Sequence, residues 1–310
     1  YPKTDSQAEF MALADRLAER AAERAVAHDR DGTFPFETFR EMHESGYLAL
    51  TVPEEYGGRG ADALEIALAQ ERLARGDGST ALAATMHLIL IGRLAEVRAW
   101  PEPIFARVCR DVVETGALLN SAASEPDLGS PSRGGLPSTT AVLTPEGWRI
   151  NGRKNWTSLA PALRYFVVMA TRHDEEKPRR AHFLVPAGTP GLRIEETWDN
   201  LGMRATASHD IVLEDVLVPA DAVLPEDGSP AVGDGRGWAL VTSAVYTGVA
   251  VAARDYAVRY ARERRPTGMP GPIAELQTVQ HRVAEMELLL LQSRAIIYGT
   301  AETWVTQPES

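Results

Sequence analysis

Two stretches of this chain decide how it folds: residues 121–130 read SAASEPDLGS, and residues 151–158 read NGRKNWTS. The small residues of the first stretch would let a flat ligand lie against the backbone. The second stretch holds one aromatic side chain, Trp156, between polar neighbours. Together they predict a site for a large planar cofactor with a phosphate tail, and a flavin nucleotide fits that description best.

Composition sets the class of protein. The chain has 310 residues, of which 44% are hydrophobic and 24% charged, as in an ordinary globular protein of two or three domains. Its net charge of −11, without a run of Lys or Arg, argues against nucleic acid or an anionic membrane as the main partner. Cys109 is the one cysteine, which favours a reducing compartment and hence the cytoplasm. We also expect no membrane span and no metal site.

The pattern of hydrophobic and turn-forming residues changes twice along the sequence, which predicts an α+β protein that is mainly helical. Apolar residues recur at helical spacing up to residue 117, with helices expected at 5–28, 36–45, 62–75, 79–97 and 103–115. Short β-branched runs separated by turn residues then predict a β-domain over 118–227, with strands at 139–143, 148–150, 165–170, 182–185 and 211–213. Pro145-Glu146-Gly147 predicts a hairpin turn between two of these strands. A C-terminal helical domain over 228–310 would hold two long helices, at 244–264 and 277–303.

Those two long helices cannot bury their apolar faces alone. We therefore expect a partner subunit, or further chain after Ser310, to complete a helical bundle.

Six motifs occur in order along nearly the whole chain. They are Val52-Pro53-Glu54-Glu55-Tyr56-Gly57-Gly58, Ser124-Glu125-Pro126 with Gly129-Ser130, Asn151-Gly152-Arg153-Lys154 with Trp156, Leu201-Gly202-Met203-Arg204 with Thr206, Leu213-Glu214-Asp215-Val216 with Pro219, and Tyr260 with Glu263-Arg264. Through these motifs the sequence resembles the acyl-CoA dehydrogenase family of flavoproteins. The resemblance implies an N-terminal helical domain, a middle β-domain and a C-terminal four-helix bundle, here apparently incomplete. It also implies FAD as cofactor and assembly as a homotetramer.

The same resemblance assigns residues to the flavin. Backbone groups of Ala123 and the Ser124 hydroxyl would bond the ring edge, and Gly129 and Ser130 would lie near the pyrophosphate. Trp156 would pack on the flavin. Arg264 and Gln277 would reach the flavin of a neighbouring subunit, so that assembly becomes part of cofactor binding. The full predicted cofactor set is Ser121, Ala123, Ser124, Gly129, Ser130, Trp156, Thr157, Ser158, Arg264 and Gln277, with Ser130 and Trp238 also expected near the substrate.

The reaction depends on a carboxylate that the sequence does not show where expected. Family members that dehydrogenate an acyl thioester use a glutamate to remove the α-proton. This glutamate lies either late in the chain, beyond the position of Ser310, or at the start of the long C-terminal helix, where this chain has Trp238. The catalytic base is therefore unassigned here and expected beyond Ser310. Arg236 and Ala239 also replace an Asp and an Arg that many members direct at the thioester arm.

Three functions follow. The first is FAD-dependent dehydrogenation of an acyl thioester of CoA or a carrier protein to a 2-enoyl thioester, with an electron-transfer flavoprotein as acceptor. The second is a monooxygenase of the same fold that uses reduced flavin and needs no such base; His87 is its candidate histidine, although a core histidine with satisfied hydrogen bonds is the favoured interpretation. The third is a non-catalytic flavoprotein subunit. His28, His43, His173, His182 and His281 are expected on the surface.

Overall fold

The computed structural model describes residues 1–127, 135–173, 177–225 and 236–307. The N-terminal part is helical, as predicted, and its helices begin at residues that can cap them. Thr4 accepts a hydrogen bond from the backbone of Gln7 at the start of α1, and Asp62 forms a capping box with Glu65 at the start of α3. The helices are α1 (Asp5–Asp31), α2 (Phe36–Glu44), α3 (Ala63–Ala74), α4 (Gly78–Val97) and α5 (Glu102–Thr115), with 3-10 turns η1 (Tyr47–Ala49) and η2 (Glu54–Tyr56).

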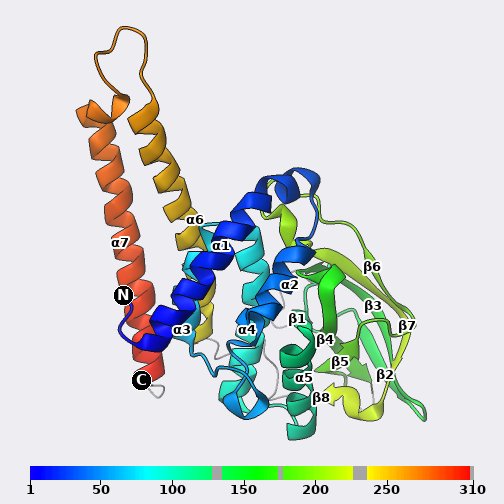
Figure 1. Cartoon of the computed structure of the whole chain (residues 1–310). Helices are drawn as coiled ribbons and strands as arrows, with labels where there is room; N and C mark the ends of the chain where they lie inside the picture. Colours follow the sequence, from blue (N-terminus) through cyan, green and yellow to red (C-terminus); the bar gives the residue numbers. More distant parts are fainter. Residues whose placement is uncertain (128–134, 174–176, 226–235, 308–310) are drawn as a thin grey trace.

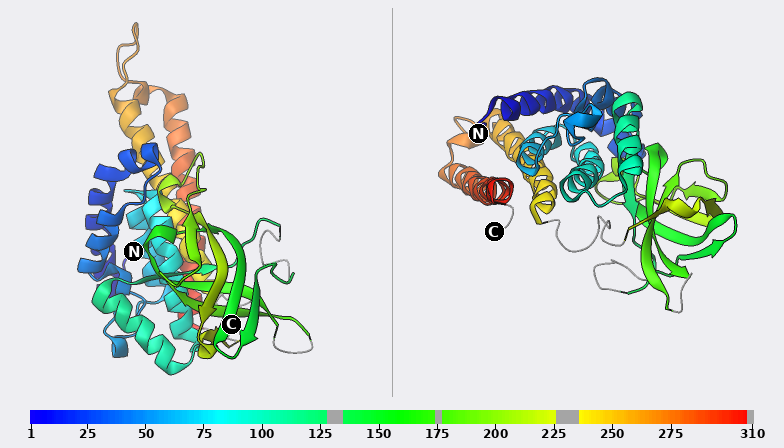
Figure 2. Two further views of the ribbon diagram at one scale, coloured as in Figure 1. Left: turned by 90° about the vertical axis from the view of Figure 1, so that its right-hand side faces the viewer. Right: turned by 90° about the horizontal axis from the view of Figure 1, so that it is seen from below.

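The middle of the chain forms one curved, mixed sheet to one side of the helices (Figure 2). Its strand order is β6-β7-β3-β2-β4-β5-β8, and β1 pairs in parallel with β4. The predicted turn at residues 145–147 is confirmed, because Thr144 pairs with Gly147 across the β2–β3 hairpin. The strands are β1 (Leu118–Ala122), β2 (Thr140–Thr144), β3 (Gly147–Thr157), β4 (Leu163–His173), β5 (Arg179–Pro186), β6 (Leu192–Glu195), β7 (His209–Val218) and β8 (Val223–Leu224). Further 3-10 turns are η4 (Ala160–Ala162), η5 (Arg204–Thr206) and η6 (Ala220–Ala222).

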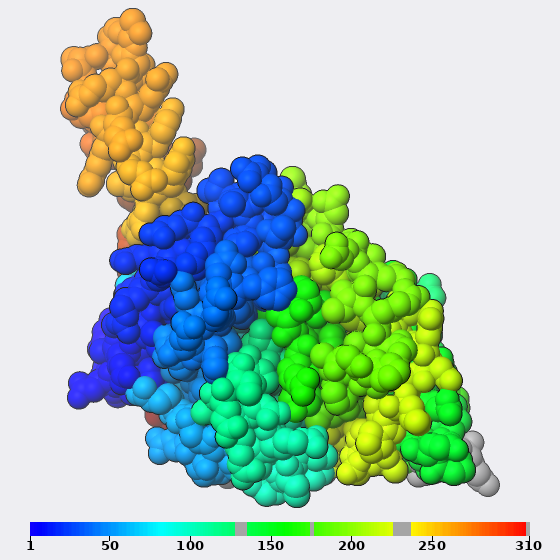
Figure 3. All heavy atoms as spheres, turned by 45° about the vertical axis from the view of Figure 1, so that its right-hand side comes forward, coloured from blue at the N-terminus to red at the C-terminus, as the bar shows by residue number. Residues whose placement is uncertain are grey.

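Two long antiparallel helices, α6 (Arg236–Glu263) and α7 (Gln277–Thr306), follow the sheet and are joined through η8 (Ile273–Glu275). Their lower halves pack on α3 and α4, whereas their connected ends project well beyond the body of the protein (Figures 1 and 3). The two helices keep large apolar side chains exposed, among them Tyr256, Leu289 and Ile296. The structure thus bears out two C-terminal helices whose apolar faces are incompletely covered.

Helix α4 is the core helix of this arrangement. It is long and apolar enough to cross a membrane by length and composition, yet 61% of its most apolar window is buried inside the fold. Contacts with α3, α6 and β1 account for that apolar composition. The helix therefore places the helical layer directly against the first strand of the sheet.

The predicted domain boundary at 117 falls between α5 and β1, and the one at 227 lies outside the described residues. Both boundaries stay predictions.

Candidate functional site

Residues 121–127 and 151–158, which hold most of the predicted cofactor residues, lie side by side in the structure. The backbone N–H of Asn155 donates to the carbonyl of Ser124 over 3.0 Å. The Asn120 side-chain amide donates to the carbonyl of Ser158, also over 3.0 Å. The chain from Asn120 to Ser124 is thus hydrogen-bonded to the end of β3, which brings the described cofactor residues of both stretches together.

Trp156 is turned away from the sheet by a break in strand register. Alternation along β3 buries Trp148, Ile150 and Lys154, and Trp156 would be next on that face. The pairing with β7 shifts between Lys154 and Thr157, so Thr157 is buried instead and Trp156 is 60% exposed. Trp156 adopts a φ of +57°, which is a strained conformation for a large side chain. An exposed, strained indole is characteristic of a binding surface rather than of a core.

Three buried polar atoms beside Trp156 have no hydrogen-bond partner among the described residues: Ser121 Oγ, Asn155 Oδ1 and Thr157 Oγ1. Buried polar groups are normally satisfied, so these atoms indicate that something is to be bound there. A flavin ring offers both donors and acceptors along one edge, and it fits this set. Ser158 differs, because its hydroxyl already bonds the Ser208 hydroxyl at 2.8 Å. Two of the predicted residues, Gly129 and Ser130, lie outside the described residues.

Arg264 and Gln277 lie together at the projecting end of the α6–α7 hairpin, and both are exposed. Within one chain this end is remote from the sheet (Figure 1). The structure therefore does not bring these two residues to the site formed by Trp156 and Ser121 of the same chain. Their predicted role toward a neighbouring subunit remains a prediction.

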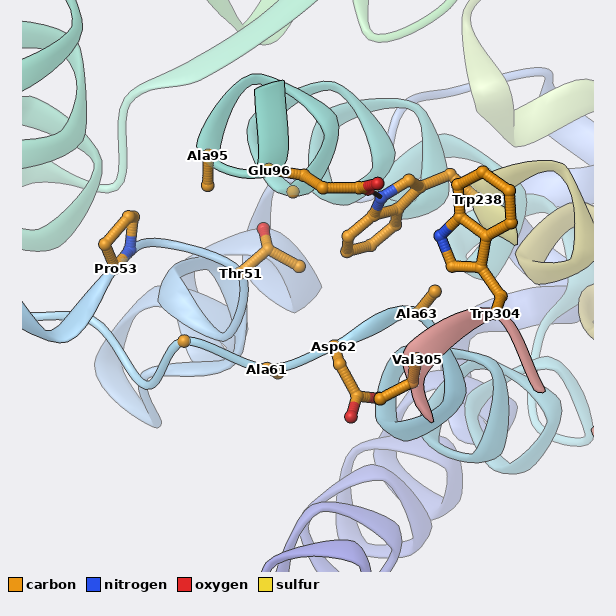
Figure 4. Close-up of a pocket in the computed structure, with 12 residues that line it drawn as sticks. Thr51, Pro53, Ala61, Asp62, Ala63, Ala95, Glu96, Trp238, Trp304 and Val305 are labelled. Atoms are coloured by element: carbon orange, nitrogen blue, oxygen red, sulfur yellow. Dashed lines mark hydrogen bonds between the residues drawn. The ribbon is translucent and has the colours of Figure 1, made fainter. Parts of the chain in front are cut away.

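A pocket of about 380 Å³ lies where α4, α6 and α7 meet (Figure 4). It lies next to Trp238, the residue predicted to be near the substrate. The indole of Trp238 is 4% exposed and donates from Nε1 to Glu96 Oε2 over 2.6 Å. Its ring lies against Gly92, where an added Cβ would come within 2.1 Å of it. Trp304 lies in the same way against Gly237, where a Cβ would come within 2.3 Å. The two indoles and the Glu96 carboxylate form one wall of the pocket.

The histidine candidate has a structural role. His87 is fully buried; its Nε2 lies 3.0 Å from the Leu48 carbonyl, and its Nδ1 accepts from the Leu119 N–H over 3.3 Å. Both ring nitrogens are thus satisfied by backbone, which confirms the core interpretation. The surface expectation for His182 is wrong, since it lies in β5 and is 2% exposed. Within the described ranges, no group of three His, Cys, Asp or Glu residues could hold a metal ion.

Comparison with known proteins gives the family. Models of the acyl-CoA dehydrogenase N-terminal, middle and C-terminal domains match residues 4–97, 120–216 and 238–310, in that order. The chain is 42% identical over 304 residues to the putative acyl-CoA dehydrogenase YdbM of Bacillus subtilis, covering 98% of this chain and 79% of that protein. This chain belongs to the acyl-CoA dehydrogenase family. It is accordingly a flavin-dependent oxidoreductase, and the non-catalytic interpretation is not retained.

Solved structures that superpose on this chain carry different names and ligands. Butyryl-CoA dehydrogenase from Megasphaera elsdenii superposes with a TM-score of 0.85 at 25% identity, over 98% of this chain and 80% of that chain. KijD3, solved with FMN and a dTDP-linked 3-amino-4-keto sugar, superposes with a TM-score of 0.82 at 33% identity, over 97% and 74%. The acyl-CoA dehydrogenase fold is therefore shown for this chain.

Several residues near the site escaped the sequence reasoning. Glu125 and Lys154 stand in the motifs quoted above without a predicted role, yet they form a buried ion pair. The alternation of β3 places Lys154 on the same face as Trp148 and Ile150, and that period-two pattern could have identified it. Glu96 had no such signal, because its contact with Trp238 joins residues 142 positions apart.

Proposed function

We propose that this chain binds FAD at the junction of β1 and β3 and dehydrogenates an acyl thioester to its 2-enoyl thioester. The observation that carries the proposal is the meeting of the two stretches, with Trp156 turned outward beside three unsatisfied polar atoms. Ser121, Asn155 and Thr157 would bond the ring, and Trp156 would pack against it. A bound flavin supplies the hydride acceptor for this reaction.

FAD is proposed over FMN because Arg264 and Gln277 are exposed and grouped where a second subunit could use them. A guanidinium there offsets the charge of a pyrophosphate, which FAD has and FMN lacks. The proposal includes a homotetramer as the assembly, an electron-transfer flavoprotein as the electron acceptor and the cytoplasm as the location. Chromatography of the flavin released by heating, against FAD and FMN standards, tests the choice of cofactor.

The pocket beside Trp238 is proposed as the place of the acyl group. Its walls are mainly apolar, with Ala61, Ala63, Ala95 and two indoles among the lining residues, which suits a hydrocarbon chain. Removal of the α-proton requires a carboxylate, and the Trp238 side chain provides none. Glu96 lies beside it but already accepts from the Trp238 indole, and Arg93 lies 3.4 Å from its other oxygen. We assign Glu96 to the shape of the pocket and leave the base unassigned.

A second candidate is oxygenation with reduced flavin. Trp238 favours it, because this residue stands where some family members carry the base, and an oxygenase needs none. KijD3, solved with FMN and a dTDP-linked sugar, shares 33% identity with this chain against 25% for butyryl-CoA dehydrogenase, so the fold also receives ligands other than acyl thioesters. His87 does not support it, because both of its ring nitrogens are bound to backbone.

One anaerobic experiment separates the two candidates. Purified holoenzyme is mixed with saturated acyl-CoAs of several chain lengths, and the flavin absorbance is followed; the matching free acids, which lack the thioester, serve as controls. Bleaching with a thioester and not with its acid is the expected result. If no thioester bleaches the flavin, while supplied reduced flavin supports O₂-dependent turnover, the dehydrogenase proposal is wrong.

A further inference from the structure

A salt bridge is buried directly behind the predicted flavin surface. Lys154 is completely buried and Glu125 is 2% exposed, and their Nζ and Oε1 atoms lie 2.6 Å apart. Isolated charges are not tolerated in such surroundings, and a pair persists only when its remaining donors and acceptors are also satisfied. Here both Glu125 oxygens have further backbone donors and Lys154 Nζ has a second acceptor, the carbonyl of Ala123 in the first of the two stretches.

The pair holds three segments of backbone together: the chain after β1, the chain before β2, and β3 itself. Lys154 Nζ also donates to the carbonyl of Ala123 over 3.4 Å. The Glu125 carboxylate accepts from the backbone N–H groups of Ser138, at 2.6 Å, and Thr139, at 2.9 Å. Residues 123–125 follow the end of β1 at Ala122, so no regular ladder fixes their path; the backbone bond from Asn155 to Ser124 and the side chains of the ion pair do.

The backbone of β3 next to the ion pair allows this close approach. Gly152, two residues before Lys154, has a φ of +153°, and a Cβ there would lie 2.4 Å from Thr139 Oγ1. Glycine at this position therefore lets the Thr139 backbone approach β3 closely enough to reach Glu125. Three residues of two sequence motifs, Glu125, Gly152 and Lys154, thus serve one local structure.

Protonation of the pair follows from its surroundings. Burial lowers the pKa of Lys154 to about 8, against the hydrogen bond and charge of Glu125 that favour the ammonium form. Burial alone would raise the pKa of Glu125, but the hydrogen bonds from Lys154 and Thr139 outweigh it and hold that pKa below its usual value. The pair is therefore ionised at neutral pH, when its hydrogen bonds are strongest.

We propose that Glu125 and Lys154 are positioning residues for the cofactor, which hold the backbone of Ala123 and Ser124 in the conformation that receives the flavin ring edge. The inference rests on the flavin site proposed above. Neither side chain reaches the surface, so neither touches the ring. They act through the carbonyl of Ala123 and through the chain on either side of it.

The test separates positioning from a merely structural role. A buried ion pair replaced by apolar side chains of similar volume often keeps the fold stable. The double variant Glu125→Met, Lys154→Met should accordingly unfold in urea close to the wild-type midpoint. Its dissociation constant for FAD should rise by about tenfold to a hundredfold, by analogy with the loss of the residues that orient the ligands of a bound metal ion. The absorbance envelope of the bound flavin should change as well.

Two further variants complete the design. Glu125→Asp keeps the charge and should recover part of the affinity and spectrum. Arg153→Met is the matched control on the same strand: its side chain points to the other face, where it binds Asp210 and Glu195, so flavin binding should stay at the wild-type value.

The outcomes are distinct. A double variant that binds FAD with wild-type affinity and spectrum overturns the inference. If the double variant does not fold, Glu125→Gln, which removes the charge at nearly the same volume, takes its place in the same comparison. Loss of affinity in Arg153→Met equal to that in the double variant also overturns it, since general weakening of β3 would then be the cause. A wild-type protein that holds flavin yet is not bleached by acyl-CoA refutes the dehydrogenase proposal alone and leaves this inference standing.

Discussion

Replacing Gly92 by alanine should destabilise the protein through Trp238. A Cβ at Gly92 would lie 2.1 Å from Cη2 of the indole and 2.5 Å from Cζ2 and Cζ3, whereas ordinary contact begins at 3.4 Å. The ring cannot move freely, because it is buried and bonded to Glu96. Overpacking of this kind costs about 1–3 kcal/mol.

The change also has a favourable part. Alanine within a helix is better than glycine by roughly 0.5–1 kcal/mol. The net loss for Gly92→Ala in unfolding free energy should then be about 1–2 kcal/mol, measured by urea denaturation of the holoprotein.

Gly299 supplies the control. It also lies inside a helix, α7, but nothing is within 4 Å of an added Cβ there. Gly299→Ala should therefore stabilise by about 0.5–1 kcal/mol. In a Trp238→Ala background Gly92→Ala should become stabilising too, with a coupling energy of about 2–3 kcal/mol. If Gly92→Ala stabilises the wild-type protein as much as Gly299→Ala does, the packing argument is refuted.

Three other expectations can be checked separately. Trp156→Ala should weaken flavin retention or shift the flavin spectrum, with an unfolding free energy within about 0.5 kcal/mol of wild type because the indole is exposed; unchanged flavin binding would contradict its assignment. Arg264→Ala should lower flavin occupancy and weaken subunit association, seen together in absorbance and sedimentation; full occupancy in a dissociated protein would argue against the role proposed for it. Burial lowers the pKa of His87 to about 4, so between pH 6.5 and 4 the unfolded chain binds a proton that the folded chain does not. As the pH is lowered through this range, the free energy of unfolding should decrease by up to about 1.4 kcal/mol per pH unit. A urea midpoint as acid-sensitive in His87→Gln as in wild type would contradict this.

Most of the fold was predictable because its signals are local. Helical periodicity and the caps at Thr4 and Asp62 mark α1 and α3, and the Pro145-Glu146-Gly147 turn marks the β2–β3 hairpin. Strand β1 was missed, since its five residues follow a helix without any turn signal except Gly116. Its parallel pairing with β4 joins residues more than forty positions apart, which local patterns do not encode.

The site was predicted only in part, for a related reason. The motifs named the residues of the site, but they did not predict that Trp156 points outward. That orientation comes from a register shift between β3 and β7, which depends on the partner strand. His182 was placed on the surface because histidine is polar, whereas the strand that carries it is buried on both sides of the sheet. The contact of Trp238 with Glu96 needs three helices to assemble first.

The length of the hairpin has a consequence for how the protein keeps its cofactor. Helix α6 has 28 residues and therefore measures about 42 Å, which carries Arg264 far from the sheet of its own chain. If Arg264 holds the cofactor of a neighbour, every cofactor site is shared between two chains. Cofactor retention then follows mass action in the protein itself: dilution that separates the chains would also release flavin, and added flavin would draw the chains together.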